Sequence, residues 1–212
     1  MLIQLLVDNP NSWIIPFTIK LKEKIEKQFS FSVSIISEHE DVIEGDFLFL
    51  LSCEKIFNKL KLNNYNLVIH ESQLPKGKGW SPLTWQVLEG ENKIPITLFE
   101  ATDKVDAGKV YFRDFINLNG DELLSEIKQK QGEKTIDLIL KFLSNYKNFP
   151  GEIQKGESTY YARRNYKDSE LNINDSIKNQ FNLLRVCDNE RYPAFFILNG
   201  EKYILKIESH KK

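Results

Sequence analysis

The sequence predicts an α/β fold with a mostly parallel sheet, followed by a small C-terminal appendage of one helix and a β-hairpin. Short apolar runs alternate with a segment of helical period within the first 36 residues. This is the βαβ pattern, for which a right-handed crossover is expected. With 212 residues and 41% hydrophobic content, the chain can bury one substantial core. We expect a main domain over residues 1–150 and the appendage over residues 151–212.

The first elements follow from turn signals that flank apolar runs. Residues 2–7 form the first predicted strand, because this run ends in the turn cluster at residues 8–11. Ser12 can cap a helix over residues 13–28, in which Pro16 is tolerated because it falls in the first turn. Two further strands are expected over residues 31–36 and 47–51, and residues 51–56 then lead into a short helix.

A strand over residues 67–69 ends on His70 and is followed by a loop rich in glycine, proline and lysine. Open α/β sheets place their chemistry in the crevice beyond the strand ends, so His70 is the first candidate for a functional residue. A structural role is the competing interpretation. The other histidines, His39 and His210, lie in an acidic loop and in a charged tail. A helix is predicted to open at Ser81-Pro82.

The second half of the chain continues with elements of both kinds. We expect strands over residues 95–101 and 109–115, a helical pair between residues 119 and 143, and an amphipathic helix over residues 173–187. The chain then closes in a hairpin of residues 195–198 and 202–207. Asn199-Gly200 between these two runs is the signature of a type I′ turn.

Composition and charge exclude several classes of function. The net charge of -1 and the pI near 6.3 give no general attraction to polyanions. Nucleic-acid binding is therefore not expected without a local basic patch, for which Lys76, Lys78, Arg163 and Arg164 are the candidates. No glycine precedes Gly45, so the first strand-to-helix turn cannot carry the G-x-G-x-x-G cradle of a dinucleotide cofactor.

The two cysteines, Cys53 and Cys187, lie far apart without metal-ligand spacing. We expect neither a disulfide framework nor a metal, and a reducing, cytoplasmic environment. Small core residues are the simplest interpretation of both. The N-terminus lacks a basic signal region, and no run approaches the roughly 20 apolar residues of a membrane span.

Two separated motifs resemble those of the formyltransferases that use 10-formyltetrahydrofolate. The first comprises His70, Ser72, Leu74-Pro75, Gly79 and Ser81-Pro82, in the family's order and spacing. The second is Asp106-Ala107-Gly108, which precedes a short strand. The resemblance covers roughly residues 48–111 well. It implies a Rossmann-like formyltransferase core as the catalytic domain, and N10-formyltetrahydrofolate as co-substrate.

The resemblance also implies roles for individual residues. His70 would be the general base, Asp106 would orient it, and Ser72 would belong to the catalytic group. An ordinary helix cap at Ser52 and a turn-forming role for Asp106 are the competing interpretations. Folate contacts are implied for Ser52, Cys53, Ile56, Leu74, Val105 and Gly108.

The sequence departs from the family two residues before the histidine. Most members carry there the Asn that is the expected oxyanion donor, whereas this chain has Val68. Asn66 would share the face of His70 but lie about 13 Å away, so it cannot simply substitute. Ser72, Gln73, a main-chain N–H or protonated His70 remain as donors.

The intact block around this motif resembles one branch of the family. That branch formylates the 4-amino group of a UDP-linked 4-amino-4,6-dideoxy-altrose-type sugar in pseudaminic-acid-related pathways. The tail mixes aromatic and cationic residues, a composition suited to a base and a diphosphate. Packing of the tryptophans and a surface ion-pair cluster of the arginines with Asp168 are the alternatives. The expected substrate contacts are Lys78, Gly79, Trp80, Ser81, Tyr161, Arg163 and Arg164.

Two other functions stay open. Methionyl-tRNA formyltransferase shares the core but adds a basic C-terminal domain, which roughly 65 residues of this charge balance do not supply. The second alternative is a folate- or nucleotide-sugar-binding module without turnover, which Val68 would explain. We expect a nucleotide-sugar partner, no nucleic acid and no membrane, and an appendage that contacts substrate or forms a homodimer surface.

Overall fold

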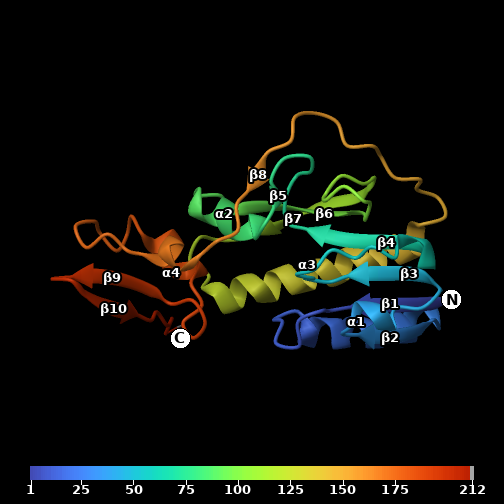
Figure 1. Cartoon of the computed structure of the whole chain (residues 1–212), viewed down its shortest axis with the longest axis horizontal. Coiled ribbons are helices and arrows are strands. Elements are labelled where there is room, and N and C mark those ends of the chain that lie inside the picture. Colours follow the sequence, from blue (N-terminus) through green and yellow to red (C-terminus); the bar gives the residue numbers. More distant parts are fainter. Residues whose placement is uncertain (211–212) are drawn as a thin grey trace.

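The protein, described by a computed structural model over residues 1–210, is built on one six-stranded sheet (Figure 1). The strand order is β2-β1-β3-β4-β6-β7. Strands β1 to β4 are mutually parallel, and β6 is antiparallel to both of its neighbours. The predicted mostly parallel α/β sheet is thereby confirmed. The strands are β1 (Leu2–Leu6), β2 (Ser32–Ile36), β3 (Gly45–Leu50), β4 (Asn63–His70), β6 (Lys93–Glu100) and β7 (Val110–Asn117).

Three helices, α1 (Ile15–Phe29), α2 (Pro82–Leu88) and α3 (Leu124–Asn145), contribute to the main core on one face of this sheet. The predicted helical pair after β7 is wrong, because α3 is a single helix of 22 residues. Its glycine, Gly132, lies under the neighbouring helix, where a Cβ would sit 2.4 Å from the Phe17 ring. The glycine therefore allows close contact between the helices rather than ending one of them.

Two predicted details near the N-terminus are wrong. Helix α1 starts at Ile15 without a side-chain cap, and Ser12 contributes only its carbonyl, which accepts from the Ile15 N–H. No helix follows β3 directly; the next helical residues are the short 3₁₀ turn Leu60–Leu62. The intervening loop is instead fixed by the Asp8 carboxylate, which accepts N–H groups from that loop.

The opposite face of the sheet carries a smaller apolar cluster of Leu6, Ile36, Val42, Leu48, Leu50 and Phe57. Side chains alternate along a strand, so β4 sends Leu67 to the main core and Val68 to this second face. His70 follows Val68 by two residues and packs edge-on against the Phe99 ring. Phe99 belongs to a small cluster against which the Val68 side chain also packs. The functional candidate therefore sits at the carboxyl end of β4, on the second face.

The appendage contains β8 (Tyr160–Tyr161), the 3₁₀ turn Tyr166–Ser169, α4 (Phe181–Val186), β9 (Ala194–Leu198) and β10 (Glu201–Leu205). The predicted hairpin turn is confirmed, because Asn199 and Gly200 have φ of 52° and 84°, both positive as type I′ requires. Ile197, Leu198 and Ile204 on this hairpin are exposed. A role in self-association stays a prediction.

The predicted helix over residues 173–187 is wrong over most of its length, because only residues 181–186 are α-helical. Side chains in the preceding segment accept backbone N–H groups: Asn172 from Asn174, and Ser176 from Asn179. Such local bonds offer the backbone an alternative to the helix. The apolar period of this segment was therefore misleading.

A buried ion pair ties the appendage to the main domain. Arg185 of α4 is 1% exposed, and its guanidinium lies 3.6 Å from the Glu122 carboxylate. Burial alone would raise the pKa of Glu122, but bonds from Lys130 and from the Asn119 and Gly120 N–H groups hold it at about 2.

Replacing Glu122 by Gln is expected to lower the free energy of unfolding at pH 7 by about 3–5 kcal/mol, because it leaves Arg185 buried without its counter-charge. The folded-state pKa is depressed, so the stabilisation is present above the ordinary Glu pKa of about 4.3 and is lost as the pH falls toward 2. Urea unfolding at pH 7 and pH 3 should show the difference between the two proteins shrinking. Glu190→Gln, whose partner Lys206 is exposed, is the control with almost no effect.

Candidate active site

His70 offers one free ring nitrogen at the end of β4. Its Nε2 lies 2.9 Å from the Gly77 carbonyl oxygen. A carbonyl only accepts hydrogen bonds, so Nε2 carries the proton and neutral His70 has an unprotonated Nδ1. Nδ1 has no hydrogen-bond partner within residues 1–210. The imidazole is therefore held in the tautomer that can accept a proton from a bound substrate.

Asp106 approaches the same imidazole through charge rather than through a hydrogen bond. Its Oδ2 lies 3.8 Å from His70 Nε2, too far for a hydrogen bond, and accepts the Gly79 N–H at 3.0 Å. The two residues converge as the sequence motifs predict. The expectation that Asp106 itself fixes the tautomer is corrected, because the Gly77 carbonyl holds the imidazole and Asp106 supplies a nearby negative charge.

The loop that carries Asp106 is tightly packed. Asp106 has a left-handed backbone conformation, with φ of 51°. At Gly108 an added Cβ would lie 1.8 Å from the Glu100 carbonyl oxygen, so only glycine fits beside β6. This packing explains the Asp-x-Gly pattern of the second motif in terms of local geometry.

One extended segment, residues 154–161, holds both loops of the site, and we call it the strap (Figure 1). Its Gln154 amide donates to the carbonyls of Asp106 and Gly108, at 3.1 and 2.9 Å. Its Thr159 hydroxyl accepts the Gly77 N–H at 2.8 Å. Its strand β8 pairs in parallel with β5, the short strand Lys78–Gly79.

Aromatic and cationic side chains gather where the strap meets the His70 loop. The Arg163 guanidinium lies 4.6 Å from the ring centre of Trp80, which is 40% exposed. Trp85 stacks on Tyr161 and donates its indole N–H to the Ala162 carbonyl. Three predicted substrate residues, Trp80, Tyr161 and Arg163, therefore share this corner, and Ser81 adjoins it at the start of α2.

Two cationic candidates differ from expectation. Lys78, one of the expected substrate contacts, is only 7% exposed, and its ammonium lies 5.9 Å from the Tyr160 ring centre. Arg164 donates to the Asp168 carbonyl. Burial raises the pKa of the Cys187 thiol, and the nearby charge of Arg164 only partly opposes this shift. Arg164 therefore contacts the segment around Asp168 and Cys187 rather than the corner around Trp80, and its predicted ion pair with Asp168 is instead a hydrogen bond to the Asp168 backbone.

Two of the predicted folate contacts, Cys53 and Leu74, pack on the second face of the sheet. Cys53 packs on the cluster that includes Val68, and Leu74 packs with Phe99 and the same Val68. Burial and the charge of Asp8 raise the pKa of the Cys53 thiol to about 12. Among the other candidates, Ile56 and Val105 are exposed apolar side chains, Ser52 is exposed, and Gly108 is buried.

Val68, at the position of the expected Asn, has apolar surroundings, and the neighbouring polar side chains do not take over the role of donor. Val68 lies between two apolar clusters, so a side-chain donor is missing there. The Asn66 amide donates to the Leu60 carbonyl at 2.8 Å and is thus engaged elsewhere. The Ser72 hydroxyl is enclosed by protein and has no partner in the described part of the chain. Direct contact of Ser72 with a substrate would require the loop to move.

Sequence reasoning missed two residues beside these loops, Gln154 and Glu71. Burial raises the pKa of Glu71, an effect opposed by the neighbouring His70 and by the Gln131 amide, which donates at 2.7 Å. Glu71 lies in the sequence between the two matched residues His70 and Ser72, and only its charge could have indicated a role in the site. Gln154 has no sequence signal, because its role depends on a distant segment folding back.

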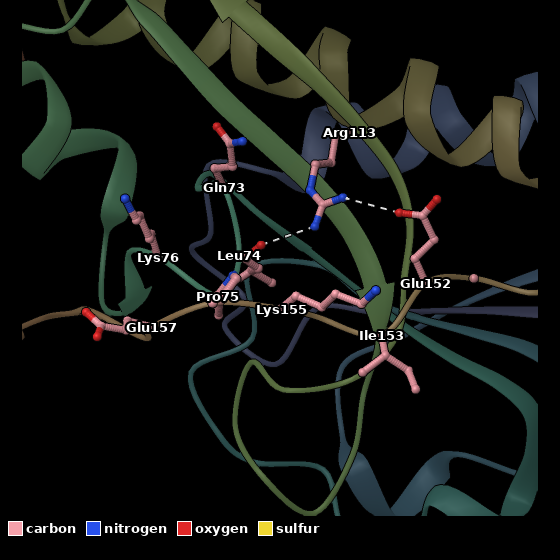
Figure 2. Close-up of a pocket in the computed structure, with 11 residues that line it drawn as sticks. Gln73, Leu74, Pro75, Lys76, Arg113, Glu152, Ile153, Lys155 and Glu157 are labelled. Atoms are coloured by element: carbon pink, nitrogen blue, oxygen red, sulfur yellow. Dashed lines mark hydrogen bonds and ion pairs between the residues drawn. The ribbon is translucent and has the colours of Figure 1, made fainter.

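An open groove of about 940 Å³ lies beside the Leu74-Pro75 turn (Figure 2). Arg113 stands in it, donating to the Leu74 carbonyl at 3.1 Å and facing the Glu152 carboxylate at 3.9 Å. Neither His70 nor Asp106 lines this groove. It borders the loop of the site from outside and is distinct from the corner around Trp80.

A free imidazole nitrogen lies beside a carboxylate at the carboxyl edge of the sheet, where open α/β sheets place their chemistry. The family model described as formyl transferase matches residues 15–143, more than half of the chain, and the chain belongs to this family.

The curated relatives that this chain matches include methionyl-tRNA formyltransferases. The methionyl-tRNA formyltransferase of Mycoplasma mycoides subsp. mycoides SC is 25% identical over 183 residues, which are 82% of this chain and 56% of that protein. The chain spans about half the length of several curated relatives that it matches. Helices long and apolar enough to cross a membrane do not occur within residues 1–210.

Solved structures named as methionyl-tRNA formyltransferase and as sugar N-formyltransferase have the same fold as this chain. The methionyl-tRNA formyltransferase from Clostridium thermocellum has a TM-score of 0.81 at 22% identity, covering 99% of this chain and 93% of that one. A sugar N-formyltransferase from Shewanella sp FDAARGOS_354 has a TM-score of 0.72 at 14% identity, covering 100% and 99%. At these identities the likeness concerns the fold alone.

Proposed function

We propose that this chain transfers a formyl group from N10-formyltetrahydrofolate to the 4-amino group of a UDP-linked 4-amino-4,6-dideoxy sugar. His70 acts as general base, and Asp106 stabilises its protonated form. The observation that carries the proposal is the free Nδ1 of His70, next to a loop whose Trp80 is paired with Arg163. The first provides the chemistry, and the second provides contacts for the acceptor.

In the proposed reaction, His70 carries one proton from the sugar amine to the folate nitrogen. His70 Nδ1 removes a proton from the sugar amine as the amine nitrogen forms a bond to the formyl carbon. The Asp106 carboxylate, 3.8 Å from Nε2, stabilises the resulting imidazolium. The Nδ1–H then donates to the tetrahedral oxyanion, which supplies a donor that Val68 cannot. When the carbon–N10 bond breaks, this proton passes to the folate nitrogen.

The corner around Trp80 suits a nucleoside diphosphate. Trp80 is 40% exposed and can stack on a base, while the Arg163 guanidinium above it can pair with phosphate oxygens. The chain's net charge of -1 lacks the general positive potential that favours tRNA. Both features support a nucleotide-linked sugar as acceptor.

A methionyl-tRNA formyltransferase is the second candidate, because relatives and solved neighbours of that name match as well. A binding module without turnover is the third, and the apolar surroundings of Val68 are the feature that favours it.

A coupled assay with 10-formyltetrahydrofolate separates the three candidates. We expect turnover with a UDP-4-amino sugar from a panel of UDP- and dTDP-linked 4-amino sugars, and none with charged methionyl-tRNA. Turnover only on the charged tRNA would replace the proposal by the second candidate. Binding of folate and UDP sugar without turnover would replace it by the third.

A further inference from the structure

Three side chains from three separate strand ends meet in one cluster that does not include His70. Asp8 follows β1, His39 follows β2 and Cys53 follows β3. A carboxylate oxygen, an imidazole nitrogen and the Cys53 sulfur all lie within 4.8 Å of one another. Because β1, β2 and β3 are parallel neighbours, their carboxyl ends share one edge of the sheet. The sequence shows no short motif here, since the topology alone brings the three residues together.

The position of each side chain is fixed by its surroundings. The Asp8 side chain is 1% exposed, and its oxygens accept the N–H groups of Glu54 and Lys55 at 2.8 to 3.1 Å. His39 Nε2 lies 3.1 Å from an Asp8 oxygen, and the Phe57 ring packs beside the imidazole. The Glu54 and Lys55 N–H groups and the Phe57 ring lie outside the three-residue set, and outer contacts orient metal ligands in known sites.

The local charge favours a cation. The loop that carries His39 reads Glu38-His39-Glu40-Asp41, and Glu54 follows Cys53, with Lys55 as the nearby opposite charge in sequence. A cluster of mostly negative groups raises the local concentration of cations. The negative local potential and the donor atoms of the three side chains therefore both favour the binding of a cation.

We propose that Asp8, His39 and Cys53 bind one divalent transition-metal ion of the zinc or cobalt class. A carboxylate, an imidazole and a thiolate form a mixed set that suits these ions, whereas Mg²⁺ and Ca²⁺ require oxygen ligands. Three protein ligands leave a fourth position for water. On binding, the Cys53 thiol releases its proton to solvent and exchanges its bond to the Leu6 carbonyl for the metal.

The ion would stabilise the loop over residues 52–57 rather than take part in formyl transfer. That loop is already attached to β1 through the Asp8 carboxylate, and a shared ion would add His39 and Cys53 to the attachment. The proposed metal site does not rest on the proposed function, but it shares Cys53 and the loop of Ser52 and Ile56 with the expected folate contacts. The site therefore requires a test that does not use turnover.

Cobalt titration of the untagged, chelator-treated full chain tests the site directly. Co²⁺ is expected to produce a near-ultraviolet thiolate-to-cobalt absorption band that saturates at one ion per chain, and Zn²⁺ is expected to abolish it. Cys53→Ser should remove the band, and His39→Gln should weaken Co²⁺ binding by at least about tenfold. Cys187→Ser, which changes the buried cysteine of the appendage, is the matched control and should keep the band.

The melting temperature provides a second readout, which remains informative if a variant folds poorly. Zn²⁺ should raise the melting temperature of the wild type and of Cys187→Ser, and should leave that of Cys53→Ser unchanged. The proposal is overturned if wild type shows no thiolate band, if the band survives in Cys53→Ser, or if Zn²⁺ stabilises Cys53→Ser as much as wild type.

Discussion

Replacing His70 by Asn is expected to lower formyl transfer by about 10²- to 10⁴-fold, the usual contribution of a general base. The shorter Asn side chain removes the unprotonated Nδ1 and also the 2.9 Å contact of His70 Nε2 with the Gly77 carbonyl. The longer His70→Gln, whose amide nitrogen reaches the place of Nε2, can keep that contact and should lose turnover as well. Steady-state turnover with 10-formyltetrahydrofolate and the UDP-4-amino sugar measures the loss, and circular dichroism checks the fold.

Two companion variants sharpen this experiment. Asp106→Asn keeps an acceptor oxygen for the Gly79 N–H and removes only the negative charge, so turnover should fall strongly with the fold intact. His210→Asn changes an exposed histidine of the tail and should leave turnover at the wild-type rate. Near-wild-type rates in His70→Asn or in Asp106→Asn would contradict the assignment of the site.

Gly108→Ala is expected to reduce turnover by about 10²-fold without touching a reacting group, because displacements of about 1 Å can cost this much. The added Cβ would lie 1.8 Å from the Glu100 carbonyl oxygen, a backbone atom of β6 that cannot rotate away. The loop must shift and carry Asp106 with it. Turnover is the readout, alongside the melting temperature.

Gly90→Ala is the matched control for this prediction. Gly90 has a φ of +95° but nothing within 4 Å of the position of an added Cβ. Its replacement should cost about 1–2 kcal/mol of stability from backbone strain, with turnover unchanged. Equal losses of turnover in both variants would show that the Gly108 effect is not a local steric one.

Much of the fold could be predicted because the signals were local. The apolar runs ending at Asp8 and at His70 mark strands, and the βαβ pattern of the first 36 residues predicts that its two strands are parallel. The Asn199-Gly200 turn needed only its two residues. Of the site, the meeting of His70 with Asp106 could be anticipated, because two separated motifs lie in the family's order.

The errors arose where distant residues determine local structure. The segment after β7 was expected to form a helical pair, but it is one helix, whose Gly132 packs against Phe17 of α1. The periodic segment before α4 is dominated by side-chain bonds to its own backbone. The tautomer of His70 depends on a carbonyl seven residues away, at Gly77. Neither periodicity nor composition indicates these contacts.

The strap also affects how this protein can be divided. A fragment ending at Asn145 would retain every strand of the central sheet, together with His70 and Asp106. It would lack the Gln154 amide and the Thr159 hydroxyl that secure the two loops. A split-enzyme experiment should therefore find that neither half turns over substrate alone, and that mixing them restores activity only when residues 154–161 dock in place.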